Sequence, residues 1–145
     1  MLPANLPDNE PDRLALLGRL GLLEQPDDPV LDRITRTAAR LFAVPVALVT
    51  LIDRDRQWFA SRHGLDLRET PRRVSFCAHA ILQQGAMVVT DASDDARFHD
   101  NPLVTEEPHI RFYAGRSVRS RQGLAVGTLC LIDHRPRTLD DAELH

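Results

Sequence analysis

The segment IRFYAGRSVRSRQGLAVGTLCLIDH, residues 110–134, contains two apolar runs joined by five polar or small residues. Their length and spacing predict a β-hairpin with strands over 112–118 and 124–132. The second run is apolar or small on both alternating faces, so we expect it to be covered on both sides and to lie in the middle of a sheet. Gly115 and Gly127 interrupt the two runs, and glycine inside a strand indicates a bulge or a close approach of backbone or ligand.

Three further strands are predicted upstream of this hairpin. The segment VPVALVTLID, residues 44–53, is apolar on both faces and rich in β-branched residues, which is typical of a second central strand. Residues 57–62 are more polar, and we place them beside it as the edge strand of a hairpin. The turn between them begins like a calcium-binding loop, but Trp58 stands where that loop needs glycine, which argues against calcium. Residues 87–90 form a short strand.

Two stretches have apolar residues at helical spacing. Residues 12–20 are rich in leucine and end before a glycine, a typical C-terminal signal. Residues 29–42 follow Asp28, which is placed to act as N-cap, and begin with a proline at the first helical position. The apolar stripe of this second helix comprises Val30, Ile34, Ala38, Leu41 and Phe42, opposite Arg33, Arg36 and Arg40. Such an amphipathic helix is expected to place its stripe on the core.

Shorter elements lie between the strands. Ser75 is placed to cap a helix over 76–84, which a glycine closes. Residues 91–107 form a long polar loop with a single helical turn that starts at 101–102. Loops of this length in a compact domain are commonly lids or binding loops. Strands interspersed with short helices predict an α+β fold, with an antiparallel sheet flanked on both faces.

The length of 145 residues fits one domain with a core of its own. Residues 1–10 are expected to form a mobile tail, and residues 11–145 the domain. A last helix is predicted over 139–145, capped by Thr138. At seven residues it is too short to be stable alone, so we expect the sequence to be cut within this element.

Charge excludes several classes of function. Eighteen basic and 21 acidic residues give a formal charge of −3, so the chain lacks the overall basic field that nucleic acid or an anionic membrane requires. All the basic residues are arginine, which excludes a phosphate-binding P-loop lysine, a kinase strand lysine and Schiff-base chemistry. Two cysteines are too few for a disulfide framework, and no signal peptide or membrane-spanning run occurs, so we expect a cytoplasmic protein.

The cysteines and the helix that follows Ser75 bear on catalysis. Cys77 and His79 lie about 200° apart around a helix, so they are not placed to share a metal ion or to act as nucleophile and base. Cys77 shares a helix face with apolar residues and is interpreted as a small buried side chain, and Cys130 as part of the core. Arg72 and Arg73 are expected to face solvent. The sequence contains no recognisable catalytic motif, and no metal site is predicted.

Four ordered blocks of this sequence resemble the GAF domain family, the sensory modules found ahead of bacterial diguanylate cyclases and histidine kinases. The blocks are DRITRTAARLFAVPVALVTLIDRDRQWF (32–59), ETPRRVSFCAHAI (69–81), VVTDASDDARFHDNPLV (88–104), and IRFYAGRSV with GTLCLIDHRPR (110–118 and 127–137). The resemblance covers about residues 12–145. It implies a central antiparallel sheet of five to six strands, with the terminal helices on one face and short helices and loops over a pocket on the other.

The resemblance also implies where a ligand would bind. We expect a pocket between the sheet and the segments 75–84 and 91–113, which would take a ligand of modest size. The candidate ligand-binding residues are Phe76, His79, Phe98, Tyr113 and Thr128. Cyclic-nucleotide-binding members carry a signature that includes lysine, which this chain lacks. Bilin-binding members attach their chromophore through a cysteine adjoining a histidine, whereas Ala78 separates Cys77 from His79 here. Both cofactors are therefore disfavoured, and the ligand is unknown.

Three functions are compatible with these features. The first is a non-catalytic sensor that binds an unidentified small molecule and regulates an output domain, a diguanylate cyclase or a histidine kinase, which is missing from this chain. The second is an enzyme like the GAF-fold free methionine sulfoxide reductases, which use several cysteines, and Cys77 is not expected to be required. The third is a dimerisation module with a vestigial pocket. The leucines of residues 12–20 and the helix at 139–145 are expected to form a parallel homodimer through the terminal helices.

Overall fold

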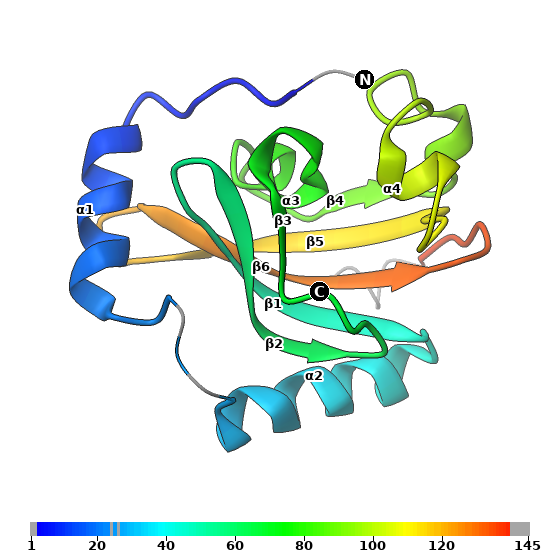
Figure 1. Ribbon diagram of the computed structural model, residues 1–145, viewed down its shortest axis with the longest axis horizontal. Helices are drawn as coiled ribbons and strands as arrows, with labels where there is room; N and C mark the ends of the chain where they lie inside the picture. Colours follow the sequence, from blue (N-terminus) through cyan, green and yellow to red (C-terminus); the bar gives the residue numbers. More distant parts are fainter. Residues whose placement is uncertain (1–2, 24, 26, 140–145) are drawn as a thin grey trace.

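The computed structural model describes residues 3–139, apart from 24 and 26. Six antiparallel strands form one sheet in the order β3-β2-β1-β6-β5-β4 (Figure 1). The strands are β1 (Val46–Ile52), β2 (Arg56–His63), β3 (Glu69–Pro71), β4 (Met87–Val89), β5 (Phe112–Arg119) and β6 (Ala125–Asp133). Helices lie on both faces of this sheet, so the predicted α+β fold is confirmed.

The predicted hairpin is the pair β5 and β6, and the two central strands are those that the sequence indicated. β6 lies between β1 and β5, and its residues alternate between the two buried faces of the sheet. Gly127 marks a close approach, because a Cβ at this position would lie 1.7 Å from the carbonyl oxygen of Thr50 on β1. The prediction that glycine here marks a tight contact is therefore confirmed.

The strand at 57–62 is not the edge that the sequence predicted. β3 pairs with Arg56, Gln57 and Trp58, the first three residues of β2, so the edge there is a three-residue strand that ends in proline. The side chain of Gln57 donates a hydrogen bond to Thr70 Oγ1 over 3.0 Å and joins the two strands. Residues 69–71, read from the sequence as a break, therefore add a sixth strand, and proline suits an edge because it donates no ladder hydrogen bond.

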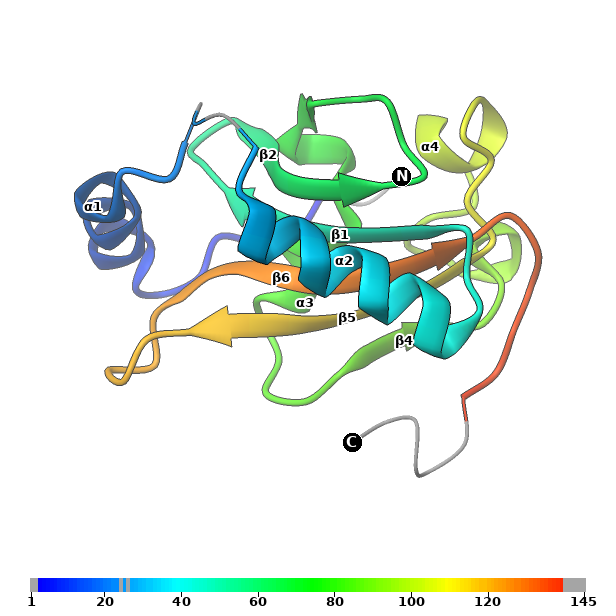
Figure 2. The same cartoon turned by 90° about the horizontal axis from the view of Figure 1, so that it is seen from below.

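One face of the sheet carries α1 (Glu10–Leu20) and α2 (Pro29–Phe42) (Figure 2). Asp28 caps α2 as predicted, since its Oδ1 accepts hydrogen bonds from the amides of Val30 and Leu31 at 2.8 and 3.4 Å. α2 lies across β1, β2 and β6, whereas α1 packs at one end of the sheet. α1 begins two residues earlier than predicted, and Gly21 ends it in the left-handed conformation.

Only part of the apolar stripe predicted for α2 lies on the core, where Ala38 and Phe42 pack against the cluster beneath the helix. The residues that α2 buries fully are Thr35 and Ala39, whereas Val30, Ile34 and Leu41 are 64%, 42% and 76% exposed. The hydroxyl of Thr35 contacts Ser61 Oγ on β2 at 3.0 Å, so a polar pair joins this helix to the sheet. Helical periodicity located the apolar stripe correctly, but the helix turns Val30, Ile34 and Leu41 outward.

The opposite face carries short helices and loops. They are the 3₁₀ turn η1 (Arg72–Val74), α3 (Phe76–Ala80), the 3₁₀ turn η2 (Ala92–Asp94) and α4 (Pro102–Thr105). Ser75 caps α3 as predicted, with its Oγ accepting from the amide of Ala78 over 3.0 Å. α3 ends four residues before the predicted end, because Arg119 on β5 donates to the carbonyls of Ile81 and Gln83, both over 3.0 Å, and these carbonyls leave the helical pattern.

Both faces of the sheet are buried. The larger apolar cluster lies under α3 and α4, and two smaller clusters lie under α2 and α1. Leu139, the last described residue, packs on the cluster beneath α2, on the face where a C-terminal helix was expected. The helix predicted over 139–145 otherwise lies outside the described residues. Within the described part of the chain, no helix is long and apolar enough to span a membrane.

Candidate functional site

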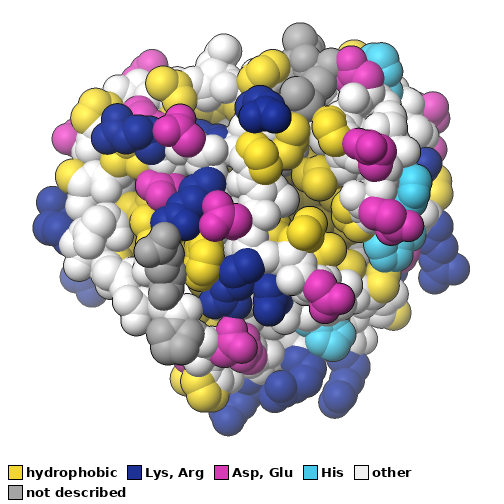
Figure 3. Space-filling model, viewed as in Figure 1, with side chains coloured by type: hydrophobic (Ala, Val, Ile, Leu, Met, Phe, Trp, Pro, Cys, Tyr) yellow, Lys and Arg dark blue, Asp and Glu magenta, His cyan; other side chains and the backbone are white. Residues whose placement is uncertain are grey.

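A cavity of about 30 Å³ lies between the sheet and the layer of α3 and α4. This volume has room for about two water molecules. Its lining is made of Val46, Leu48, Gln57, Phe59, Leu65, Leu67, Thr70, Phe76, Cys77, Leu103, Pro108, Ile110, Tyr113, Cys130 and Ile132. Figure 3 shows hydrophobic side chains gathered around a hollow on this face of the molecule. The predicted pocket therefore exists as a small apolar cavity, and no side chain in this lining carries a permanent charge.

Both cysteines of the chain lie side by side in the wall of this cavity. Cys77 on α3 and Cys130 on β6 are 2% and 0% exposed, and their Sγ atoms are 3.8 Å apart. Two hydroxyl groups also reach Cys77 Sγ, that of Tyr113 over 3.0 Å and that of Thr128 over 2.9 Å. The burial that the sequence indicated for both cysteines is confirmed, but their contact was not predicted.

The hydroxyl groups of Tyr113 and Thr128 donate hydrogen bonds to Cys77 Sγ. The hydroxyl groups of Thr50 and Thr128 are hydrogen-bonded to each other over 2.9 Å. Because the hydroxyl of Thr128 donates its proton to Cys77 Sγ, it accepts from Thr50. Burial raises the pKa of the Cys77 thiol, but the hydrogen bonds with Cys130, Thr128 and Tyr113 outweigh it and lower this pKa to about 7. The same interaction with Cys77, together with burial, raises the pKa of Cys130 well above its ordinary value. Cys77 is therefore the sulfur that ionises first.

The five candidate ligand-binding residues lie on this side of the sheet, at different depths. Phe76 and Tyr113 line the cavity, with ring centroids 5.3 Å apart. Thr128 lies beside them and contacts Cys77. Phe98 stacks on the far side of Phe76 at 4.0 Å, and His79 contacts the edge of Phe98 at 5.0 Å. Phe98 and His79 therefore support the wall without lining the cavity, and ligand contact by any of the five stays a prediction.

Sequence reasoning missed the floor of the cavity, which the sheet supplies. Val46 and Leu48 on β1, Phe59 on β2 and Ile132 on β6 point to this face because they alternate with residues that face α2. The alternation was visible in the sequence, but the choice of face was not. No sequence signal joins Cys77 to Cys130, since 53 residues separate them.

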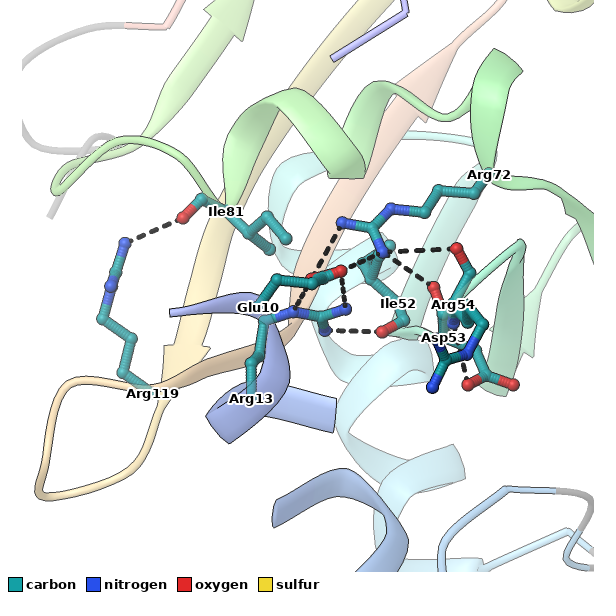
Figure 4. Close-up of polar contacts among 8 residues, drawn as sticks. All are labelled: Glu10, Arg13, Ile52, Asp53, Arg54, Arg72, Ile81 and Arg119. Atoms are coloured by element: carbon teal, nitrogen blue, oxygen red, sulfur yellow. Dashed lines mark hydrogen bonds and ion pairs between the residues drawn. The ribbon is translucent and has the colours of Figure 1, made fainter. Parts of the chain in front are cut away.

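A second buried polar group links α1 to the edge of this layer, and Figure 4 shows it. The carboxylate of Glu10 accepts from Arg13 Nε over 2.7 Å and from Arg72 Nη1 over 2.6 Å. Arg13 is completely buried and also donates to the carbonyl of Ile52, and Arg72 also donates to the carbonyl of Asp53. The prediction that Arg72 faces solvent is wrong, because this carboxylate and these carbonyls satisfy its guanidinium inside the fold. Its neighbour Arg73 is exposed as predicted.

Among the described residues, no group of three or more histidine, cysteine, aspartate or glutamate side chains is placed to hold a metal ion. The arrangement of the cavity is instead that of an apolar site with a few convergent polar groups. Those groups are the hydroxyls of Tyr113 and Thr70, the amide of Gln57 and the two thiols.

The comparisons with known proteins agree with this architecture. The sequence matches the GAF domain family over residues 28–145. The chain belongs to the GAF domain family. As a GAF domain it is 50% identical over 131 residues to a cyclic di-GMP phosphodiesterase of Pseudomonas aeruginosa, a match that covers 90% of this chain. The chain spans only 22% of the length of that relative.

Solved structures show the same fold at low sequence identity. The GAF domain of a phosphoenolpyruvate-protein phosphotransferase from Acinetobacter superposes with a TM-score of 0.63 and 16% identity, over 95% of this chain and 85% of that one. A free methionine-R-sulfoxide reductase from Neisseria meningitidis, solved with its substrate, superposes with a TM-score of 0.63 and 16% identity, over 99% of this chain and 86% of that one. The GAF fold therefore occurs in an enzyme as well as in domains of larger proteins.

Proposed function

We propose that this GAF domain is a non-catalytic regulatory module of a signalling protein, and that it controls an output domain according to the occupancy of its cavity. The observation that carries the proposal is the cavity itself, which lies between a rigid sheet and a layer of short helices and loops. A ligand in this position contacts both layers at once, so it favours the arrangement of loops that fits it.

The relative of Pseudomonas aeruginosa supports a proposal for the output. That relative is named as a cyclic di-GMP phosphodiesterase, and this chain matches 22% of its length. We therefore propose that the domain regulates cyclic di-GMP turnover in a larger protein. This replaces the broader expectation of a cyclase or a histidine kinase with a single second messenger.

The lining restricts the chemistry of the ligand. It offers apolar side chains with a few hydroxyl, amide and thiol groups and no permanent charge, which suits a neutral compound better than a nucleotide. A ligand larger than about two water molecules must move side chains at the loop side of the cavity, where Leu65, Leu67, Leu103 and Pro108 lie. Closure of these residues over the ligand is the motion we propose for the signal.

A bulky side chain in the loop layer tests this function. We expect Leu103→Trp to fill the cavity and to remove the regulation of cyclic di-GMP hydrolysis in the full-length protein that carries this domain. Leu82→Trp is the matched control, because Leu82 is 43% exposed and lies outside the cavity. The measurement is the change in the rate of hydrolysis when a fraction of a cell extract is added. The proposal is contradicted if the same fraction changes the rate in both variants. In the isolated domain, a ligand at a hundred times its Kd stabilises the fold by about 2.7 kcal/mol, which thermal unfolding detects.

A methionine sulfoxide reductase is the second candidate, because two thiols meet at the cavity. The volume of about 30 Å³ is much smaller than a free amino acid, so this activity requires a wide opening of the loops. The test is to incubate the reduced protein with free methionine sulfoxide and a thiol reductant, and to measure methionine. We expect no methionine beyond what the reductant alone produces. If the protein does turn over the sulfoxide and Cys77→Ser abolishes that turnover, the enzyme is favoured instead.

We also propose a homodimer, with α2 as a principal part of its interface. Among the leucines of α1, Leu20 is exposed, but Leu17 is buried and Leu14 and Leu16 are partly buried. This helix therefore mainly covers its own sheet. The outward stripe of Val30, Ile34 and Leu41 on α2 is the larger apolar surface. Apolar stripes of this kind pair in symmetric helical interfaces.

The dimer predicts a specific response to charge. We expect the double variant Ile34→Glu with Leu41→Glu to be a monomer at tens of micromolar by light scattering, where the unmodified domain is a dimer. Leu82→Glu, an exposed leucine on the opposite layer, is the control and leaves the dimer intact. A dimer that survives the double substitution shows that the interface lies elsewhere. A dimer that forms normally while no ligand shifts the unfolding temperature favours a dimerisation module with a vestigial pocket.

A further inference from the structure

We propose that Cys77 and Cys130 form a redox-reactive thiol pair, and that a small peroxide entering the cavity converts it to an intramolecular disulfide. This is a modification site with its own chemistry, and it stands whether or not the domain regulates an output. Three observations support the proposal: the two sulfurs are in contact, the cavity reaches both of them, and two hydroxyl groups donate to one of them.

The geometry brings the sulfurs close to bonding distance. They are 3.8 Å apart, whereas a disulfide bond is about 2.05 Å long, so the sulfurs must approach by roughly 2 Å. Cys77 lies on α3, a helix of five residues that the sheet does not hold by backbone pairing, while Cys130 lies in the central strand β6. The required shift therefore falls on α3 and leaves the sheet in place.

The hydrogen bonds assign different roles to the two sulfurs. Cys77 Sγ receives the hydroxyl groups of Tyr113 and Thr128, which stabilise its thiolate, and Cys130 Sγ lies beside it at 3.8 Å. A thiolate is the nucleophilic form of cysteine, so Cys77 is the attacking sulfur and Cys130 the resolving one. The sequence interpretation of Cys77 as a small buried side chain rested on the apolar residues of its own helix face. The contact with Cys130 adds a reactive role to that buried position.

The size of the cavity selects the oxidant. A volume of about 30 Å³ accommodates about two water molecules, and hydrogen peroxide is of similar size. Bulky disulfides and alkyl peroxides exceed this volume. The apolar walls also exclude charged oxidants, because the lining offers them no opposite charge.

The chemistry balances with one peroxide for each pair. The Cys77 thiolate attacks one oxygen of hydrogen peroxide, the O–O bond breaks, and the departing hydroxide takes the proton of Cys130, giving a sulfenic acid and water. The Cys130 thiolate then attacks Cys77 Sγ, the S–S bond forms, and the S–O bond breaks with release of hydroxide. The two sulfurs give up two electrons in total, and the peroxide oxygens accept them.

The first test follows both thiols of the reduced protein during exposure to hydrogen peroxide. We expect one equivalent to remove both thiols together, with a mass lower by about 2 Da and a peptide that links Cys77 to Cys130. tert-Butyl hydroperoxide, which exceeds the cavity, should react at least about tenfold more slowly. Retention of both thiols, equal rates with the two peroxides, or addition of oxygen without a disulfide would each overturn the proposal.

Three variants separate the roles of the residues. Cys130→Ser should stop at a sulfenic acid on Cys77 that a dimedone probe labels, and Cys77→Ser should leave Cys130 unlabelled. Tyr113→Phe removes one donor to the thiolate, so the reaction should slow by about tenfold at pH 7 and its pH midpoint should rise from about 7 toward 8.5. Tyr113 and Cys130 are the other titratable groups that line the cavity beside Cys77. An unchanged midpoint in a folded Tyr113→Phe protein shows that the hydroxyl groups do not activate the sulfur and overturns the assignment of roles.

Discussion

Replacing Glu10 by alanine is expected to lower the free energy of unfolding by about 3–5 kcal/mol, because it leaves two buried arginines without their shared counter-ion. Arg13 is completely buried, and the side chain of Arg72 is 9% exposed. Both guanidinium groups direct two nitrogen atoms at the Glu10 carboxylate. Backbone carbonyls accept further hydrogen bonds from both, but they do not neutralise the charge.

Denaturant unfolding of matched variants checks this result. Asp12→Ala is the control, since it removes an exposed acidic residue from the same first turn of α1 and should cost no more than about 1 kcal/mol. A triple variant with Glu10→Leu, Arg13→Met and Arg72→Met should recover most of the loss, because it removes all three charges together. A Glu10→Ala protein as stable as the Asp12→Ala control shows that water reaches the guanidinium groups and contradicts the buried pair.

The same carboxylate gives stability a defined dependence on pH. Burial raises the pKa of Glu10, but the hydrogen bonds and charges of Arg13 and Arg72 outweigh it and hold this pKa below its ordinary value. The stabilising contribution is therefore complete above about pH 4.3, the pKa of an unfolded glutamate, and is lost as the pH falls through the lowered folded value. The difference in stability between the unmodified protein and Glu10→Gln should shrink across that acidic interval.

Local sequence patterns predicted the strands, helices and caps of this fold. Contacts between residues distant in the sequence decided which surfaces of these elements are covered. The hairpin of β5 and β6, the caps Asp28 and Ser75 and the central place of β1 all follow from neighbouring residues. The exposure of Val30, Ile34 and Leu41 on α2 does not follow from neighbouring residues. Periodicity locates an apolar stripe on a helix, but it does not tell which part of the fold covers that stripe.

The candidate site was harder to predict than the fold. Phe76 and Tyr113 were assigned to the cavity through the family resemblance, and they line it. The Cys77 and Cys130 contact joins α3 to β6, and the Glu10 and Arg72 contact joins α1 to η1. Such contacts depend on the packing of whole elements, so neither spacing nor composition reveals them.

The glycine at 127 is expected to be as important for stability as the buried ion pair. A Cβ at this position would lie 1.7 Å from the carbonyl oxygen of Thr50 and 3.0 Å from the Cα of Leu51, all within the pairing of β1 and β6. Backbone atoms of two central strands have no free space to move into, so Gly127→Ala must push the strands apart. We expect a loss of about 3–5 kcal/mol, or roughly 10 °C in the unfolding temperature.

Gly18→Ala is the control for this last substitution, because both changes add one methyl group in place of a glycine hydrogen. Gly18 is exposed on α1, and a Cβ there meets no atom within 4 Å. Alanine should therefore stabilise the protein by about 0.5–1 kcal/mol through its higher helix propensity. Opposite signs in the two variants place the effect of Gly127 in the contact of the strands rather than in the conformational freedom of glycine. A Gly127→Ala protein within 1 kcal/mol of the unmodified one would mean that β1 and β6 tolerate separation beside Thr128, and hence that the floor of the cavity is not rigid.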